Sequence, residues 1–369
     1  MEKIYNFIDV FSGCGGLSYG LEQAGFRCLL GIDHDKDAIE TFKLNHKDAE
    51  TYCGDVRDLK NSMIKDLLQG ESVDLVVGGP PCQGFSTIGK GNSDDPRNFL
   101  FLEFVRIVRL AKPKAVVIEN VTGLLANKNK DVLKKIFSIF EDLGYQLDAR
   151  VLSSDEYGVP EKRRRTIIIG CKEGMQPIFP TPSHGERGTK KVATVKDAFK
   201  SIKKKATYND PATAQVKNDL DRKRLKYIPE GCGIRYKKDQ EAYLPKSLHY
   251  DVIWEELREG RFRQTKLQRL SYSSPSFTIL TSRTMYYHPI ECRYLTAREA
   301  ASIQSFPWDF HFVGSTTSVF KQIGNAVPVK MATAIGNALR ESLSGKVLSI
   351  DKNKDFKKYA FHYNKEIAV

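Results

Sequence analysis

The first half of the chain alternates between short, almost continuously apolar runs and segments in which apolar residues recur with helical spacing. The apolar runs predict β-strands at Tyr5–Val10, Cys28–Asp33, Val73–Gly78, Ala115–Glu119 and Arg165–Gly170. The segments between them predict helices at Leu17–Ala24, Ala38–Asn45, Phe99–Leu110 and Val132–Leu143. Apolar strands separated by helices are typical of a mainly parallel sheet covered on both faces. We therefore expect a doubly wound α/β domain.

The pattern changes after about residue 175, where proline, lysine and glycine become frequent and clear periodicity is lost. Basic clusters lie at residues 203–205, 222–224 and 236–238, and a solvated surface is the simpler interpretation of any one of them. An amphipathic run at Met331–Leu339 then predicts a helix that returns to the first domain. We expect residues 1–180 to form the α/β domain, 181–318 a smaller domain, and 319–369 the return and a basic tail.

The composition favours a protein that binds a polyanion. Apolar residues make up 41% of the chain, and no apolar run approaches the roughly 20 residues needed to cross a bilayer. The net charge of +13 points to nucleic acid, because neutralised phosphates release condensed counterions, although charge alone leaves other partners open. The seven cysteines are scattered without zinc-ligand spacing, and no leader precedes the first strand. We expect a cytoplasmic protein with free thiols, no metal and no membrane segment.

A glycine-rich turn, Phe11–Gly16, follows the first strand and opens the first helix. Glycines in such a turn allow positive φ angles and a close approach of the backbone to a ligand. Asp33 comes 20 positions after Gly13 and ends the next strand, where a carboxylate can bind ribose hydroxyls. The pattern indicates an adenosine-containing ligand, with a purely structural turn as the alternative. Ser18 stands where the dinucleotide motif has its third glycine, which disfavours a nicotinamide cofactor.

Two candidate catalytic side chains follow two other strands. Cys82 comes directly after two prolines, which fix a rigid turn because they cannot continue a helix or a central strand. A thiol presented at the edge of a sheet is a candidate nucleophile, whereas most cysteines are inert. Glu119 ends the strand that should neighbour the one before Cys82, and burial would raise the pKa of its carboxyl toward that of a general acid. A carboxylate that caps the next turn is the alternative for Glu119.

Six motifs, in this order, resemble those of the cytosine-5 DNA methyltransferase family. They are Asp9–Gly16, Gly79–Ser86, Glu119–Val121, Tyr157–Arg165, Arg293–Glu299 continued by Gln304–Pro307, and Gly324–Pro328. The resemblance covers about residues 5–340 and is interrupted only by the basic region. It implies a Rossmann-like methyltransferase fold, S-adenosylmethionine as the methyl donor and a specific cytosine in double-stranded DNA as the substrate.

The resemblance also implies roles for individual residues. Cys82 would attack carbon 6 of a cytosine turned out of the duplex, Glu119 would serve ring nitrogen 3, and Arg165, with Arg163 beside it, would contact the carbonyl oxygen. The implied S-adenosylmethionine site consists of Phe11, Ser12, Gly13, Gly15, Gly16, Asp33, Asp55, Pro80, Asn325 and Val327. The implied DNA contacts are Gln83, Ser86, Arg97 and Arg293, with base recognition in the basic region. Glu161 departs from the family, which usually has glutamine at this position.

Three other functions fit parts of the pattern. A branch of the same family methylates transfer RNA, but the residues Gln83–Ser86 and the sizeable basic region favour DNA. A catalytically inactive sensor of S-adenosylmethionine and DNA would not need Cys82, Glu119 and Arg165. A nicotinamide-dependent dehydrogenase has no use for a thiol at a Pro-Pro turn. We therefore expect a monomeric DNA methyltransferase, the modification enzyme of a restriction system whose endonuclease acts separately.

Overall fold

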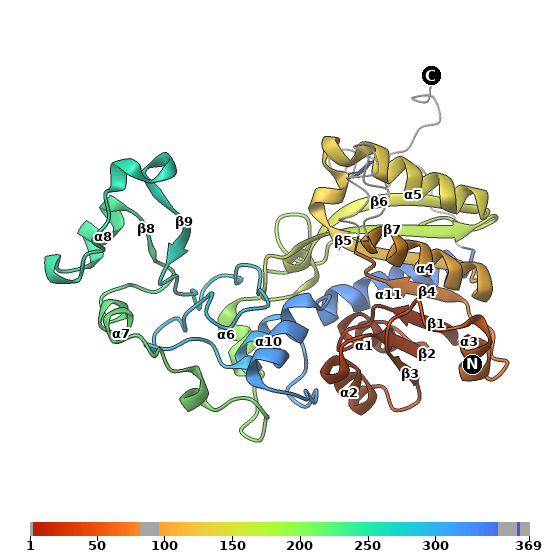
Figure 1. Ribbon diagram of the computed structural model, residues 1–369, viewed down its shortest axis with the longest axis horizontal. Coiled ribbons are helices and arrows are strands. Elements are labelled where there is room, and N and C mark those ends of the chain that lie inside the picture. The colour runs from red at the N-terminus through yellow and green to blue at the C-terminus, as the bar shows by residue number, and fades with distance from the viewer. Residues whose placement is uncertain (1–2, 82–95, 346–359, 362–369) are drawn as a thin grey trace.

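The computed structural model describes residues 3–81, 96–345 and 360–361, and an eight-stranded sheet is its main feature. The strands lie in the order β10-β6-β7-β5-β4-β1-β2-β3 (Figure 1). They are β1 (Tyr5–Val10), β2 (Phe26–Asp33), β3 (Glu50–Cys53), β4 (Leu75–Gly78), β5 (Ala115–Val121), β6 (Tyr145–Ser153), β7 (Arg164–Lys172) and β10 (Ala360–Phe361). Neighbouring strands among β1 to β5 run parallel, which confirms the expected doubly wound sheet.

The sheet has an antiparallel side that the strand pattern did not predict. Strand β7 runs antiparallel to both β5 and β6, and β10 runs antiparallel to β6. Strands β6 and β7 are separated by the short 3₁₀ helix η4 (Ser154–Tyr157) and a few further residues. A connection of this length allows an antiparallel hairpin but not the crossover that a parallel pair needs. The first residues of β7 therefore lie at the same edge as the carboxyl end of β5.

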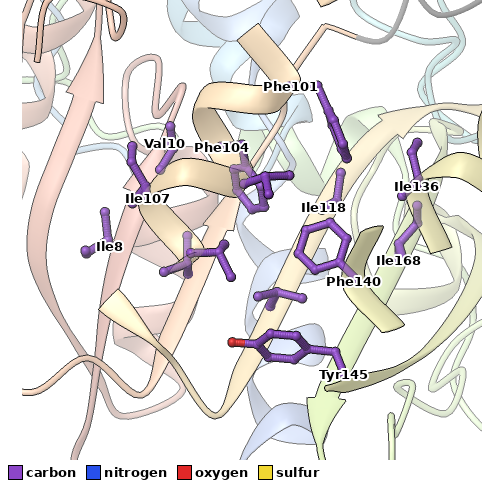
Figure 2. Close-up of a cluster of buried hydrophobic side chains, with 14 of the residues drawn as sticks. Ile8, Val10, Phe101, Phe104, Ile107, Ile118, Ile136, Phe140, Tyr145 and Ile168 are labelled. Carbon is purple, nitrogen blue, oxygen red and sulfur yellow. The ribbon is translucent and has the colours of Figure 1, made fainter. Parts of the chain in front are cut away.

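Helices cover both faces of the sheet because successive strand residues point to opposite sides. Ile8, Val76 and Val116 face one side, where they pack against α3 (Asn61–Leu68), α4 (Pro96–Ala111) and α5 (Lys130–Asp142). Figure 2 shows aromatic side chains of α4 and α5 gathered around Ile118 of this face. No helix in the described ranges has the length and apolar character required to cross a membrane.

The opposite face of the sheet is covered by α1 (Gly16–Gln23), α2 (Lys36–Asn45) and α11 (Val329–Leu343). Helix α11 is the predicted returning helix, and it lies against α1 (Figure 1). A Cβ atom at Gly20 of α1 would lie 2.3 Å from Cβ of Ala332, so only glycine allows this separation. The contact between α1 and α11 brings residues 324–328 beside the glycine-rich turn.

A smaller lobe follows β7 and contains α6 (Val195–Lys200), α7 (Asp219–Leu225), β8 (Ile234–Tyr236), α8 (Lys237–Tyr243) and β9 (Arg261–Lys266). Leu225, Ile234 and Trp254 belong to a buried cluster that the lobe forms from its own residues. Figure 1 shows β8, β9 and α8 projecting away from the large sheet. A separate cluster, which includes residues of α9 (Ala297–Ile303) and α10 (Thr316–Asn325), leads back to the main domain. The domain limits at residues 181 and 318 stay a prediction.

Candidate active site

A cavity of about 650 Å³ opens at the carboxyl edge of the parallel strands. Val10, Gly78 and Ile118 are neighbours across β1, β4 and β5, so the residues that follow them emerge at one edge. Arg165, at the start of the antiparallel β7, lies opposite Val121 and reaches the same edge. Residues 321–327 complete the wall of the cavity. The turns after these strands therefore converge on one cavity.

The turn after β1 is held to the end of β2 by Asp33. Phe11 and Gly13 both have positive φ angles, of 67° and 54°. The N–H of Gly13 donates a hydrogen bond to Oδ2 of Asp33 at 2.8 Å, and the N–H of Asp35 donates to Oδ1 at 2.9 Å. Phe11, Ser12, Gly13 and Asp33, which the resemblance assigns to the S-adenosylmethionine site, all line the cavity. The carboxylate of Asp33 therefore sets the shape of the turn and also faces the cavity.

Gly15 and Gly16, the next two glycines of the turn, each allow a close contact with a different part of the chain. A Cβ atom at Gly15 would lie 2.2 Å from Nε2 of His46, which is a buried residue, and Gly15 does not line the cavity. A Cβ atom at Gly16 would lie 2.7 Å from the carbonyl oxygen of Val327. The absence of a side chain at Gly15 therefore makes room for His46 beside the turn. At Gly16 it allows residues 324–327 to pack against the turn and line the cavity. Asn325 and Val327, which the resemblance assigns to the same site, line the cavity.

Asp55 lies on the other side of the same pocket, after β3. The guanidinium of Arg57 donates hydrogen bonds to both oxygens of Asp55, at 2.9 and 3.0 Å from Nε, and these bonds lower the pKa of Asp55 to about 2. Arg57, His34 and Lys321 also line the cavity. Sequence reasoning missed these three residues, since no motif marks them.

Glu119 and Arg165 form an ion pair at the cavity, with 2.9 Å between Oε1 and Nε. Their side chains are only 15% and 17% exposed. Burial raises the pKa of Glu119 above its usual value, while the charges of Arg165 and Arg163 act in the opposite direction. A Cβ atom at Gly79 would lie 3.2 Å from Oε2 of Glu119. The turn after β4 therefore lies directly against this carboxyl group.

Asn120 fixes the turn that leads to Cys82. Its Nδ2 donates a hydrogen bond to the carbonyl oxygen of Pro80 at 2.9 Å. Pro81 lines the cavity, whereas Pro80, a predicted cofactor residue, does not. Cys82 lies outside the described residues, as do the predicted DNA contacts Gln83 and Ser86. Sequence reasoning gave Asn120 no role, although it stands beside Glu119 in the motif.

The arginines expected beside Arg165 and in the DNA contact are both buried. Arg163 borders the cavity, but its guanidinium donates to two backbone carbonyl oxygens, those of Ile279 at 3.2 Å and Gly324 at 2.8 Å. We therefore assign Arg163 a positioning role.

Arg293 is only 4% exposed and does not line the cavity. Its N–H groups donate to the carboxylates of Glu291 and Glu299 and to the carbonyl oxygen of Tyr294. These bonds use all five donors that a guanidinium has. This corrects the expectation of a DNA contact, because Arg293 has neither an exposed surface nor a free donor. Arg97 lies in the first turn of α4, and its side chain is outside the described part.

Similarity to known proteins agrees with this geometry. The model of the C-5 cytosine-specific DNA methylase family matches residues 5–341. The chain is 35% identical over 336 residues to the Type II methyltransferase M1.HphI of Haemophilus parahaemolyticus, covering 90% of this chain and 86% of that protein. It is 35% identical over 353 residues to M.PspPI of Psychrobacter sp. (strain TA137), covering 93% and 80%.

A solved structure shows the same overall arrangement. It is described as a DNA modification methyltransferase encoded within a prophage (E. coli), and it matches with a TM-score of 0.66 and 28% identity. The match covers 92% of this chain and 99% of that one. The extent of the family match and the identity to the relatives establish the identity of the protein: the chain belongs to the C-5 cytosine-specific DNA methylase family and is a DNA cytosine-5 methyltransferase.

Proposed function

We propose that the protein transfers the methyl group of S-adenosylmethionine to carbon 5 of a specific cytosine in double-stranded DNA, through a temporary covalent bond from Cys82. The observation that carries the proposal is the half-buried pair of Glu119 and Arg165, 2.9 Å apart in the cavity that the glycine-rich turn also lines. Asn120 anchors the carbonyl oxygen of Pro80, two positions before Cys82 in the sequence.

The residues around the glycine-rich turn fit S-adenosylmethionine. The volume of the cavity lies within the range of about 300–1,000 Å³ that is usual for ligand sites. Asp33 offers carboxylate oxygens to the ribose, Asp55 can accept a hydrogen bond from the adenine amino group, and Phe11 can pack on the adenine ring. When bound, S-adenosylmethionine supplies a methyl group activated by a sulfonium. Gly15 and Pro80 support this site from outside the cavity.

Carbon 5 of cytosine is a weak nucleophile, so electron density must first be moved onto it. The thiolate of Cys82 adds to carbon 6 and forms a carbon–sulfur bond. Glu119, whose carboxyl holds its proton more readily than an exposed one, donates to ring nitrogen 3 and offsets the charge that develops there. Arg165 is placed to hold Glu119 and to contact the carbonyl oxygen of the base.

Carbon 5 would then take the methyl group, which would leave the donor as a neutral thioether, and the proton on ring nitrogen 3 returns to Glu119. The reaction ends with loss of the carbon 5 proton to a base or to water. The carbon–sulfur bond then breaks, the electron pair returns to the sulfur of Cys82, and the aromatic ring is restored. None of these atoms can be reached inside a duplex, so the cytosine has to be flipped out of the stack into the cavity. We assign the nearby phosphate and base contacts to Gln83, Ser86 and Arg97, and the choice of DNA sequence to the smaller lobe.

The named relatives suggest a biological setting. M1.HphI and M.PspPI are described as Type II methyltransferases. We infer that this protein is likewise the modification enzyme of a restriction system, acting as a monomer apart from its endonuclease.

The test is methyl transfer to defined nucleic acids. Purified protein is incubated with tritium-labelled S-adenosylmethionine and either duplex DNA from an unmethylated host or transfer RNA. We expect label in 5-methylcytosine of the DNA alone, and a covalent complex with DNA that contains 5-fluorocytosine. Label only in transfer RNA would assign the protein to a different substrate, and the absence of a covalent complex would contradict the role of Cys82.

A further inference from the structure

Glu161 lies at a junction between the catalytic domain and the segment that follows the smaller lobe. Its side chain is fully buried. Its Oε1 accepts a hydrogen bond from the N–H of Ile279 at 2.5 Å, whereas its Oε2 has no partner among the described residues. Lys162 donates its N–H to the carbonyl oxygen of Ser276 at 2.8 Å. Residues 276–279 are therefore held along the segment that leads into β7.

Arg163 holds the same segment from the other side. It donates to the carbonyl oxygen of Ile279, so both backbone groups of Ile279 are bound by side chains two positions apart. Its second bond goes to the carbonyl oxygen of Gly324, where a Cβ atom would lie 2.5 Å from the carbonyl carbon of Leu280. Three segments thus meet at Arg163: the entry to β7, residues 279–281, and the wall formed by residues 324–327.

Arg165 connects this junction to the chemistry. It follows Arg163 by two positions in an extended chain, so Glu161, Arg163 and Arg165 point to one side. Arg165 pairs with Glu119 at 2.9 Å. The charges of Arg165 and Glu119 both act on Arg163, and Arg163 also binds the wall at Gly324. A shift of the Arg163 guanidinium would therefore disturb both the pair of Arg165 with Glu119 and this wall.

The charges around Glu161 do not compensate for an ionised carboxylate at this place. In the described part of the chain no ion pair joins Glu161 to Arg163, and Nε of Arg163 has no hydrogen-bond partner. The other groups that act on this region are Arg165, Tyr286 and, through the arginines, Glu119. Burial raises the pKa of Glu161 to about 7, although Arg163, the N–H of Ile279 and Arg165 all act to lower it.

A neutral carboxylic acid offers the same hydrogen-bonding groups as a glutamine side chain. Each provides one carbonyl oxygen as acceptor and a donor on the other atom. An ionised Glu161 would instead place a charge on the unpartnered Oε2, which is costly in a buried site. The ionised carboxylate would attract the guanidinium of Arg163, whose Nε–H is free to bind it. This attraction would pull the guanidinium away from the carbonyl oxygens of Ile279 and Gly324.

We propose that Glu161 is a positioning residue that keeps Arg163 and Arg165 in place only while its carboxyl is neutral, so that methyl transfer slows when Glu161 loses its proton. The proposal rests on the proposed function, because the position of Arg165 matters only if Arg165 and Glu119 act on the cytosine. It makes the catalytic pair of this protein sensitive to pH near neutrality, whereas glutamine at the same position would not.

The experiment compares single-turnover methyl transfer by the wild type and by Glu161→Gln, with saturating DNA and S-adenosylmethionine, from about pH 6 to about pH 8.5. At each pH the rate constant of the wild type is divided by that of Glu161→Gln. In this ratio the titration of Cys82, which both proteins share, cancels. We expect a ratio near one at the acidic end, and a fall of about tenfold or more at the alkaline end as Glu161 ionises. Glu141→Gln, a change at an exposed carboxylate of α5, is the matched control, and its ratio to the wild type should stay constant.

Each outcome bears on one proposal. A ratio of wild type to Glu161→Gln that does not change with pH overturns the role of Glu161, while activity of both proteins leaves the proposed function intact. No transfer by either protein at any pH contradicts the proposed function instead. Thermal unfolding at about pH 6 checks that Glu161→Gln folds, which we expect because glutamine retains the acceptor for Ile279. If it does not fold, Glu161→Met, which also cannot ionise and fills an irregular gap, replaces it in the same ratio.

Discussion

Two parts of the cavity are lined by different elements: the turns after β1, β2 and β3 on one side, and the turn after β4, the end of β5 and the entry to β7 on the other. We call them the donor side and the base side, after the ligands that we propose for them. On the donor side, hydrogen bonds from Lys321 and Arg57 lower the pKa values of Asp35 and Asp55. On the base side, burial raises the pKa values of Glu119 and Glu161. Asp9, buried in β1 beneath the glycine-rich turn, is the exception on the donor side.

The difference in carboxyl pKa suits the two sides to different tasks, ligand binding on the donor side and proton transfer on the base side. Carboxylates that stay ionised suit a site that must accept hydrogen bonds from ribose and adenine over a wide pH range. Carboxyls that hold a proton more readily suit a site that must donate one to a base. A variant on the base side should therefore change the rate with little effect on donor affinity, and a variant on the donor side should do the reverse.

Cys82→Ala should give the largest contrast between the loss of methyl transfer and the change in affinity for the methyl donor. We expect no detectable methyl transfer, because the proposed mechanism assigns the addition to carbon 6 to Cys82 alone, and donor affinity close to that of the wild type, because we assign Cys82 no part in binding the donor. Calorimetry with S-adenosylmethionine and the tritium assay measure the two quantities. Turnover at the wild-type rate would remove the assigned nucleophile.

Glu119→Gln should have the next largest effect. The amide keeps the shape of the carboxyl but cannot transfer a proton, so we expect the rate of methyl transfer to fall by about 10² or more. The dissociation constant for S-adenosylmethionine should stay within about twofold of the wild type, since Glu119 faces the base. A rate within a few-fold of the wild type would mean that another group serves ring nitrogen 3.

The raised pKa of Glu161 should also change the free energy of unfolding. This change should occur at lower pH than the change in methyl transfer. The folded-state pKa of about 7 exceeds the usual 4.5, so the folded protein binds a proton that the unfolded chain has released. The resulting stabilisation is complete below about pH 4.5, is lost as the pH rises to about 7, and stays lost above that. It amounts to about 3 kcal/mol and should be absent from Glu161→Gln.

Urea unfolding at several pH values measures this difference. Asp9, whose pKa is also raised to about 7 by burial, contributes equally to both proteins and cancels in the comparison. The activity ratio should change mainly above the pH at which the stability difference has levelled off. Parallel pH dependence of the two proteins in unfolding would show that Glu161 is not protonated in this range.

The sequence predicted much of the donor side because its elements are local. The turn after Val10 and the carboxylate of Asp33 stand at the ends of apolar strands, and glycine spacing identifies them. Strand β3 and helix α3 were missed: β3 has only four residues, none of them fully buried, and α3 buries only Ile64 and Leu68. Strand β6 was missed too, since its polar and apolar residues are mixed.

The base side was predicted less completely, because its contacts join distant parts of the chain. Glu119 and Arg165 were found from strand ends and motifs, but no local pattern shows that Arg163 reaches Ile279, 116 positions away, or Gly324, 161 positions away. Arg293 was misassigned for another reason: its partners Glu291 and Glu299 are near in sequence, but its burial depends on the fold and has no local signal.

Asp33→Asn should have the smallest effect and should appear on the donor side alone. Both carboxylate oxygens of Asp33 accept backbone N–H groups, from Gly13 and Asp35, and asparagine offers one oxygen and an NH₂ group that cannot accept. One of the two backbone donors therefore loses its partner, the turn relaxes, and the ribose loses an acceptor. Loss of a hydrogen bond to a charged group costs roughly 1.5–3 kcal/mol, so we expect affinity for S-adenosylmethionine to fall by about tenfold or more. At saturating donor the rate of methyl transfer should stay close to that of the wild type, as should both quantities in Asp48→Asn, a change at an exposed carboxylate. If Asp33→Asn instead lowered the saturated rate and left affinity unchanged, the division of the cavity into a donor side and a base side would be wrong, because the turn would then be positioning the reacting atoms rather than the ligand.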